Sequence, residues 1–314
     1  MILLICFLIL ILTGLGISLY CFQTGFYVPK RTALAPGEFD LPPGEIYEPY
    51  HESMKKWALE TRNTPHETFY IQSFDGLTLC GRYYELEPGA PIELMFHGYR
   101  GNAERDLSGA MQRCFRLGRS AFIVDQRASG SSDGKVITFG VNESRDCLAW
   151  VQFAVDHFGP DVKLILTGLS MGASTVLMAS RFPLPENVIG ILADCGYNSQ
   201  KEIICRVIRQ MGLPPKVFYP FAKLGARIFG KFDLEEITPE EALKHCTVPV
   251  LFFHGETDDY VPCEMSRRNY DVCPTRKQLV IIPGAGHGLS YPKGKELYMN
   301  PAKAFFGPEG SIYP

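Results

Sequence analysis

Ser170 lies at the centre of the pentapeptide Gly168-Leu-Ser-Met-Gly172, a Gly-x-Ser-x-Gly pattern. An apolar run at 163–167 precedes it, and a helical pattern at 173–181 follows it. A sharp turn from strand to helix presents the serine hydroxyl at the end of the strand, and the small flanking residues let the two elements approach closely. The helix N-terminus stabilises developing negative charge. The pattern therefore predicts that Ser170 is a nucleophile that attacks an acyl carbon.

A serine hydroxyl is a weak nucleophile until a base removes its proton. His287 is predicted to be that base, because it lies in the glycine-rich segment 283–288 directly after the last predicted strand. Asp258 follows the preceding strand and is predicted to orient the imidazole, with the adjacent Asp259 as the alternative acid. The chain order serine, aspartate, histidine is the order expected for this turn on an open α/β sheet.

The negative oxygen of such a reaction needs two backbone N–H donors. Met171, the residue after the nucleophile, is expected to supply one. Tyr99 is expected to supply the other, because Gly98 lets the chain turn inward after a buried strand. His97 and His254 adjoin buried strands and are interpreted as structural. No cluster of metal ligands is visible in the sequence and this chemistry needs none, so no metal and no cofactor is expected.

From residue 68 onward, short apolar runs alternate with longer helical patterns. The turn Asp75-Gly76 predicts a β-hairpin over 68–84. Further strands are predicted at 92–96, 121–124, 164–166, 188–193, 248–253 and 278–282. Such alternation implies a mostly parallel central sheet flanked by helices on both faces, the α/β class. About fifty residues separate the strands that end near 194 and begin at 248, more than one crossover needs, which predicts a helical cap at about 196–245.

The first 22 residues are almost wholly apolar, and the first charged side chain is Lys30. A helix needs about 20 apolar residues to cross a bilayer core. A cleaved signal peptide is the alternative, but the run lacks a basic segment before it. We therefore expect residues 1–24 to be a single-pass membrane anchor, with Lys30 and Arg31 favouring a cytoplasmic catalytic domain. A linker with a short helix (25–67) and the catalytic domain (68–314) follow.

Composition excludes several classes of protein. The net charge of -3 gives no electrostatic reason to expect nucleic acid as a partner. Ten cysteines are present without any Cys-x-x-Cys pair, which argues against zinc-ribbon and thioredoxin-like sites. Free buried thiols, and with them a reducing compartment, are expected. A disulfide between Cys263 and Cys273 is the alternative that the spacing allows.

Together these motifs resemble the α/β-hydrolase superfamily. Within it the chain is similar to membrane-anchored or secreted esterase-like enzymes grouped with serine-aminopeptidase-type and BEM46-like hydrolases. The resemblance covers roughly residues 68–290, and one departure is Ala128, where the family usually has glycine. It rests on the motifs His97-Gly-Tyr-Arg-Gly, Asp125-Gln-Arg-Ala-Ser-Gly-Ser-Ser, Gly168-Leu-Ser-Met-Gly, His254-Gly-Glu-Thr-Asp-Asp-Tyr-Val-Pro and Gly286-His-Gly.

The residues and the resemblance predict hydrolysis of a carboxylic ester or related acyl bond in a small-molecule acyl substrate, through an acyl-enzyme. A peptidase of short peptides is the first alternative, although it needs an acidic anchor for the substrate amine. A membrane-tethered binding protein without catalysis is the second. The predicted cap is rich in apolar residues that either pack it onto the body or line an acyl pocket. These are Leu213, Val217, Phe218, Tyr219, Phe221, Leu224, Ile228 and Phe229.

Overall fold

The computed structural model describes residues 1–29 and 37–307 of the chain. Eight strands form one sheet in the order β1-β2-β4-β3-β5-β6-β7-β8. β1 and β2 form an antiparallel hairpin, β2 pairs antiparallel with β4, and all pairs from β4 to β8 are parallel. The strands are β1 (Glu67–Gln72), β2 (Thr78–Tyr84), β3 (Ile92–Phe96), β4 (Ser120–Asp125), β5 (Leu164–Leu169), β6 (Val188–Asp194), β7 (Val250–Gly255) and β8 (Lys277–Ile282).

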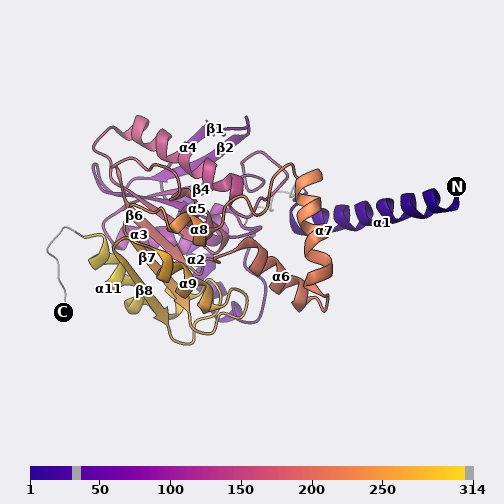
Figure 1. Ribbon diagram of the computed structural model, residues 1–314. Helices are drawn as coiled ribbons and strands as arrows, with labels where there is room; N and C mark the ends of the chain where they lie inside the picture. Colours follow the sequence, from indigo (N-terminus) through magenta and orange to yellow (C-terminus); the bar gives the residue numbers. More distant parts are fainter. Residues whose placement is uncertain (30–36, 308–314) are drawn as a thin grey trace.

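Helices cover both faces of the sheet, which is why β3, β4 and β7 are buried along their whole length (Figure 1). On one face lie α4 (Val141–Phe158), α5 (Met171–Ala179) and α9 (Cys263–Val272). On the other lie α3 (Ala103–Arg116) and α11 (Lys295–Phe305), with α2 (His51–Asn63) packed against α3. Three short helices are η1 (Glu48–Tyr50), α8 (Pro239–Leu243) and α10 (Ser290–Lys293). The predicted α/β fold with a mostly parallel sheet is confirmed.

The alternative disulfide between Cys263 and Cys273 is wrong. Both residues are free thiols. They stand at opposite ends of α9, and a helix of ten residues separates its ends by about 15 Å. A disulfide requires Cα atoms within about 7 Å of each other.

Between β6 and β7 the chain forms α6 (Gln200–Gln210) and α7 (Pro215–Ile228) before the short α8. The N-cap of α6 is Ser199, whose side chain accepts from the N–H of Glu202. The buried face of α6 carries Ile203 and Ile204, which share an apolar cluster with Met171. These helices stand beside the sheet on the side from which α1 emerges (Figure 1).

Helix α1 (Ile2–Gly25) has a mean hydropathy of 2.9 over its most apolar window and is long and apolar enough to cross a membrane. Its first twelve residues, 2–13, are exposed, whereas its second half packs against α7. Ser18 is fully buried at this contact, and Phe22 lies 5.9 Å from Phe229, ring centre to ring centre. Gly225 makes the contact close: a Cβ there would stand 2.3 Å from the carbonyl oxygen of Ser18.

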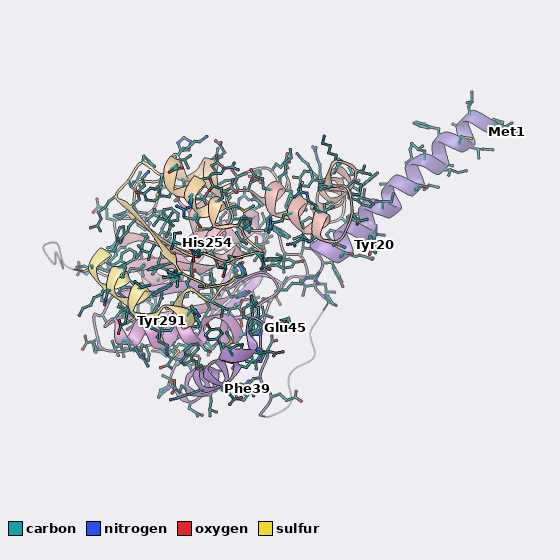
Figure 2. The ribbon with its side chains drawn as sticks, turned by 90° about the horizontal axis from the view of Figure 1, so that it is seen from below. Met1, Tyr20, Phe39, Glu45, His254 and Tyr291 are labelled. Atoms are coloured by element: carbon teal, nitrogen blue, oxygen red, sulfur yellow. The ribbon has the colours of Figure 1, made fainter. Side chains whose placement is uncertain are left out.

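The segment from residue 37 to α2 folds back onto the body, as the positions of Phe39 and Glu45 show (Figure 2). Asn102 donates to the carboxylate of Asp40 at 3.0 Å. Further along, His51 Nε2 lies 3.1 Å from the carbonyl oxygen of Pro42. This segment was predicted as a linker, and its described part is held by side chains of the body.

We predict that Gly225→Ala weakens the packing of α7 on α1, because the new methyl group would collide with the backbone of Ser18. Gly16→Ala is the matched control, since nothing lies within 4 Å of a Cβ at that position. Both changes add the same methyl group to a helix. The free energies of unfolding of the two variants should therefore differ by about 1–3 kcal/mol, which is the cost of overpacking at Gly225. Chemical unfolding of the full-length protein in detergent measures it. Equal stability of the two variants would contradict the close contact.

Candidate active site

The turn between β5 and α5 holds Ser170 in a strained backbone conformation, with φ 55° and ψ −117°. Two glycines make the turn sterically possible. A Cβ at Gly168 would stand 2.2 Å from backbone atoms of Gly172. A Cβ at Gly172 would stand 2.1 Å from the carbonyl oxygen of Phe96. The sequence pattern thus has a direct physical reason here: strand β3, strand β5 and helix α5 meet where no side chain fits.

The side chains of Ser170, His287 and Asp258 lie in one hydrogen-bonded row. His287 Nε2 is 2.8 Å from Ser170 Oγ, and His287 Nδ1 is 2.7 Å from Asp258 Oδ2. Asp258 follows β7, and His287 lies in the loop after β8, so the ends of three strands supply the row. If Nδ1 donates to the carboxylate, Nε2 is left to accept the serine proton.

The carboxylate of Asp258 is held ionised by its surroundings. Burial alone raises the pKa of such a group, but hydrogen bonds from His254 and His287 outweigh it and lower the pKa of Asp258 to about 2. The backbone N–H groups of Tyr260 and Val261 also donate to Oδ1, at 3.0 and 2.8 Å. At neutral pH this position therefore carries a fixed negative charge facing the imidazole of His287.

The two neighbouring candidates take other positions. Asp259 is exposed, and its backbone carbonyl accepts from Arg206 at 2.5 Å. His254 is fully buried between β7 and α9, with Nδ1 2.7 Å from Ser266 Oγ and Nε2 2.8 Å from the carbonyl oxygen of Val261. Both ring nitrogens of His254 thus have partners, and the ring supports the loop that carries Asp258.

The loop after β3, which contains Tyr99, lies beside the nucleophile. A Cβ on Gly98 would stand 3.5 Å from Ser170 Cβ, and the Gly98 N–H donates to Asp106 at 2.9 Å. Met171, the second predicted donor, is the first residue of α5, where a helix leaves its N–H without an internal partner. The Tyr99 hydroxyl donates to the carbonyl oxygen of Gly25 at 2.7 Å, so this loop is tied to the end of α1.

His97 has a structural environment. It is fully buried, and burial lowers its pKa. Its Nε2 accepts from the N–H of Gln126 at 3.0 Å, which places the ring proton on Nδ1, 2.8 Å from the carbonyl oxygen of Gly98. His97 therefore joins the loop after β3 to the loop after β4.

The loop after β4 is built around buried charges. Asp125 accepts from the N–H groups of Ala103 and Ser131, and Arg127 forms an ion pair with buried Asp146. Ala128 has a φ of 61°, the left-handed region that glycine adopts most easily. This explains why a glycine is usual at this position in the family that the sequence resembles.

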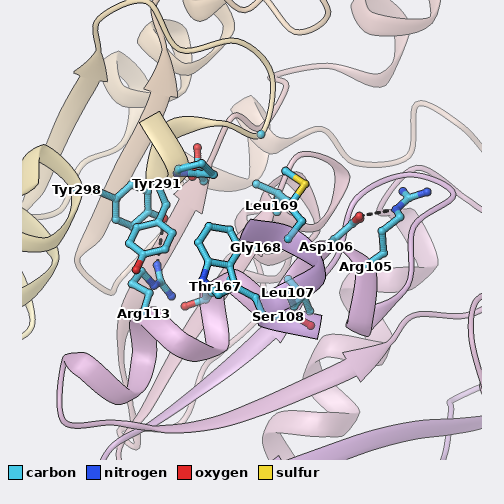
Figure 3. A pocket seen from close by; sticks show the side chains of 17 residues that line it. Arg105, Asp106, Leu107, Ser108, Arg113, Thr167, Gly168, Leu169, Tyr291 and Tyr298 are labelled. Carbon is cyan, nitrogen blue, oxygen red and sulfur yellow. Dashed lines mark hydrogen bonds and ion pairs between the residues drawn. The ribbon is translucent and has the colours of Figure 1, made fainter. Parts of the chain in front are cut away.

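A cavity of about 80 Å³ lies behind the turn of Ser170 (Figure 3). Thr167, Gly168 and Leu169 form one wall, and residues of α2, α3, α10 and α11 line the rest together with Asp194 and Gly288. Buried Arg113 donates to the Tyr298 hydroxyl at 3.0 Å on its far side. Ligand pockets usually enclose about 300–1,000 Å³, so this space suits a few water molecules rather than an acyl substrate.

Three residues near the candidate site were not predicted to belong to it. The ring of Tyr260 lies 5.1 Å from that of His287. Cys195 follows β6 and is buried; its thiol, a carboxylate oxygen of Asp258 and a ring nitrogen of His287 lie within 4.8 Å of one another. Such a trio has the composition of a metal site. However, burial raises the pKa of Cys195 well above its ordinary value, and both nitrogens of His287 already have partners.

The third is Tyr47, from the segment predicted as a linker. Burial raises the pKa of its hydroxyl, and the charges of Cys195, Asp258 and Asp106 raise it further. The neighbouring Ile46 approaches the loop of His287, with a methyl 3.3 Å from where a Cβ of Gly286 would stand. Only the folded structure brings this segment to the site, because more than 200 positions of sequence separate it from the loops of Asp258 and His287.

Residues 94–297 match the alpha/beta hydrolase family, which is more than half of the chain, so the chain belongs to this family and is a hydrolase by fold. Similar proteins include the uncharacterized protein YqkD of Bacillus subtilis, 26% identical over 238 residues (76% of this chain, 78% of that one). Protein bem46 of Schizosaccharomyces pombe is 24% identical over 222 residues (69% and 68%). The lysophosphatidylserine lipase of Danio rerio is 23% identical over 260 residues (74% and 64%).

Among solved structures, an esterase of Pyrococcus furiosus shares the fold with a TM-score of 0.65 and 18% sequence identity. The likeness covers 89% of this chain and 97% of that chain. The resemblance to the α/β-hydrolase superfamily, predicted from the motifs, is confirmed.

We predict that Asp258→Asn is far more damaging to turnover than Asp259→Asn. An amide at 258 no longer holds His287 in the proton-accepting tautomer, and a comparable change in another triad lowers kcat about 10⁴-fold. The exposed Asp259 has no such contact, and its variant is the matched control. Ester hydrolysis by the two purified variants gives the ranking. If Asp259→Asn lowered kcat more than Asp258→Asn, Asp259 and not Asp258 would be the residue that orients His287.

Proposed function

We propose that this protein is a serine hydrolase that cleaves carboxylic esters of small molecules. The observation that carries the proposal is the row of hydrogen bonds from Asp258 through His287 to Ser170, with donor–acceptor distances of 2.7 and 2.8 Å. Both are hydrogen-bond distances, and at 2.8 Å His287 Nε2 is within reach of the proton of Ser170 Oγ. The order of the three side chains along the row matches the roles of acid, base and nucleophile.

In the proposed reaction, Ser170 Oγ attacks the ester carbonyl while its proton passes to His287 Nε2. Asp258 stabilises the resulting imidazolium. The negative oxygen is bound by the backbone N–H groups of Met171 and Tyr99. His287 returns the proton to the leaving alcohol, which leaves an acyl group on Ser170. Water activated by His287 then releases the acid and restores the serine.

The surroundings favour an ester over a peptide. Met171 and Tyr99 belong to an apolar cluster that also includes α6 and α7. A peptidase that binds a free amine needs an available carboxylate. The carboxylates of Asp258, Asp194 and Asp106 are each already hydrogen-bonded, Asp194 to Ser290 at 2.6 Å and Asp106 to Gly98 at 2.9 Å. The similarity to a lysophosphatidylserine lipase also favours an ester with an apolar acyl chain.

Ser170→Ala should abolish acyl-enzyme formation in a protein that stays folded, because Ser170 is 8% exposed and loses only its hydroxyl. Loss of one member of such a triad lowers the rate by about 10⁴–10⁶-fold. A fluorophosphonate probe should label the wild type and not the variant. A panel of p-nitrophenyl esters and aminoacyl amides should show hydrolysis of the esters alone. Normal turnover by folded Ser170→Ala would show that Ser170 is not the nucleophile. Preferred cleavage of the aminoacyl amides would show that the protein is a peptidase and not an esterase.

We further propose that α1 is an uncleaved, single-pass membrane anchor. Its 24 residues are about 36 Å long, enough to cross a hydrocarbon core of about 30 Å. Ser18 and Phe22 are packed into the folded protein, which favours retention of the helix over its removal. The prediction of a cytoplasmic catalytic domain rests on Lys30 and Arg31, which lie outside the described residues, and on the ten free cysteines.

Alkaline carbonate extraction tests the anchor. This treatment strips peripheral proteins from membranes and leaves spanning helices in the bilayer, so full-length protein should stay in the pellet. Leu8→Arg combined with Leu12→Arg is the matched variant, since each charge costs about 2.5–3.5 kcal/mol at the centre of a spanning helix. Both positions are exposed in the folded protein, so the catalytic domain should fold normally. Release of the wild type by carbonate would contradict the anchor.

A further inference from the structure

Helix α7 presents an unusual surface to its surroundings. Tyr219, Ala222 and Ala226 are buried against the body. The opposite side carries large apolar side chains that are 40–52% exposed: Val217, Leu224 and Ile228. With the half-buried Phe221 they follow one another at intervals of three and four residues and so form a single stripe. We call these four residues the α7 stripe. A surface helix of a soluble protein normally turns polar residues outward.

The charged residues of the segment that forms α7 have one sign. Between Pro214 and Lys231 the sequence contains four basic residues and no acidic one. Lys216, Arg227 and Lys231 are exposed, whereas Lys223 pairs with Glu235. Apolar side chains bordered by exposed cations are the pattern of helices that lie in the interface of an anionic membrane.

The position of α7 on α1 points to the same partner. α7 runs across α1 rather than along it (Figures 1 and 2). The contact is at Ser18, and the ring of Phe221 lies 3.7 Å from where a Cβ of Gly14 would stand, on the free-end side of the crossing. The α7 stripe is therefore turned towards the exposed half of α1.

The length of α1 then fixes the depth of α7. Residues 2–13, which project beyond the crossing, reach only about 18 Å, which is short of a hydrocarbon core of about 30 Å. For α1 to span the bilayer, the part of α1 beside α7 has to be within the membrane as well. The crossing helix is thereby brought to the boundary between acyl chains and headgroups.

We propose that the α7 stripe docks into the surface of the bilayer that α1 crosses, with acidic phospholipid headgroups as the partners of the flanking cations. The proposal rests on the proposed anchor. It makes the cap an interfacial element, so the candidate site beside it takes its acyl ester from the membrane surface.

Leu224→Trp in full-length protein reconstituted into phosphatidylcholine–phosphatidylserine vesicles tests this docking. Acyl chains that carry bromine quench tryptophan fluorescence on contact. Leu297→Trp is the matched control: Leu297 is also a leucine on a helix, 53% exposed against 40% for Leu224, at the other end of the molecule. The signal of the native Trp57 and Trp150 is measured on the wild type and subtracted.

Interfacial helices bury their apolar face about 5–10 Å into the boundary, so brominated lipid should lower the emission of Leu224→Trp roughly twofold. The emission of Leu297→Trp should not change. Equal quenching of both variants, or of neither, would overturn the docking. An unquenched Leu224→Trp that forms cross-linked dimers would overturn it too, and would assign the stripe to a second copy of the chain.

The same vesicles separate this proposal from the others. Fluorophosphonate labelling of Ser170 reports the hydrolase without involving the α7 stripe. Quenching without labelling would therefore support the docking and overturn the proposed reaction. Labelling without quenching, in protein that resists carbonate extraction, would support the reaction and the anchor and overturn the docking.

Discussion

The candidate site depends on one steric constraint, the meeting of three backbone segments at the turn after β5. Atoms of Gly172 and Phe96 occupy the space that side chains at 168 and 172 would need. This close approach sets the strained φ of Ser170 and begins α5 directly after it, so that the Met171 N–H and the Ser170 hydroxyl share one edge of the sheet. The loops of Asp258 and His287 reach the same edge because parallel strands end together there.

Local signals allowed much of this to be predicted from the sequence. The Gly168–Gly172 pattern is a contiguous steric requirement, and the apolar strands are nearly continuous because both faces of the sheet are covered. Asp258 and Asp259 were harder to distinguish from each other, because adjacent residues have almost the same sequence neighbours. Only the folded loop shows which of the two carboxylates faces His287. Cys195 and Tyr47 gave no signal, since their place beside the site comes from contacts between distant parts of the chain.

The apolar residues of α7 show a second limit of sequence patterns. Helical spacing identifies which residues share a face, but it does not say what covers that face. Tyr219 packs inward, as one interpretation of the apolar cap residues expected, and Ala222 and Ala226 share its buried face. Leu224 and Ile228 point outward, and neither packing on the body nor an acyl pocket accounts for that placement. What distinguishes their surroundings is the crossing of α1 over α7 at Gly225, a contact between distant parts of the chain.

The contact between Ser18 and Gly225 also orders events during synthesis. The ribosome makes α1 first, and its packing partner emerges about 200 residues later, which at about 5–20 residues per second is a delay of roughly 10–40 s. Through that interval Ser18 of α1 lacks the neighbour that covers it in the folded protein. Helix α1 thus reaches its final packing on the cap only after most of the sequence between them has been translated.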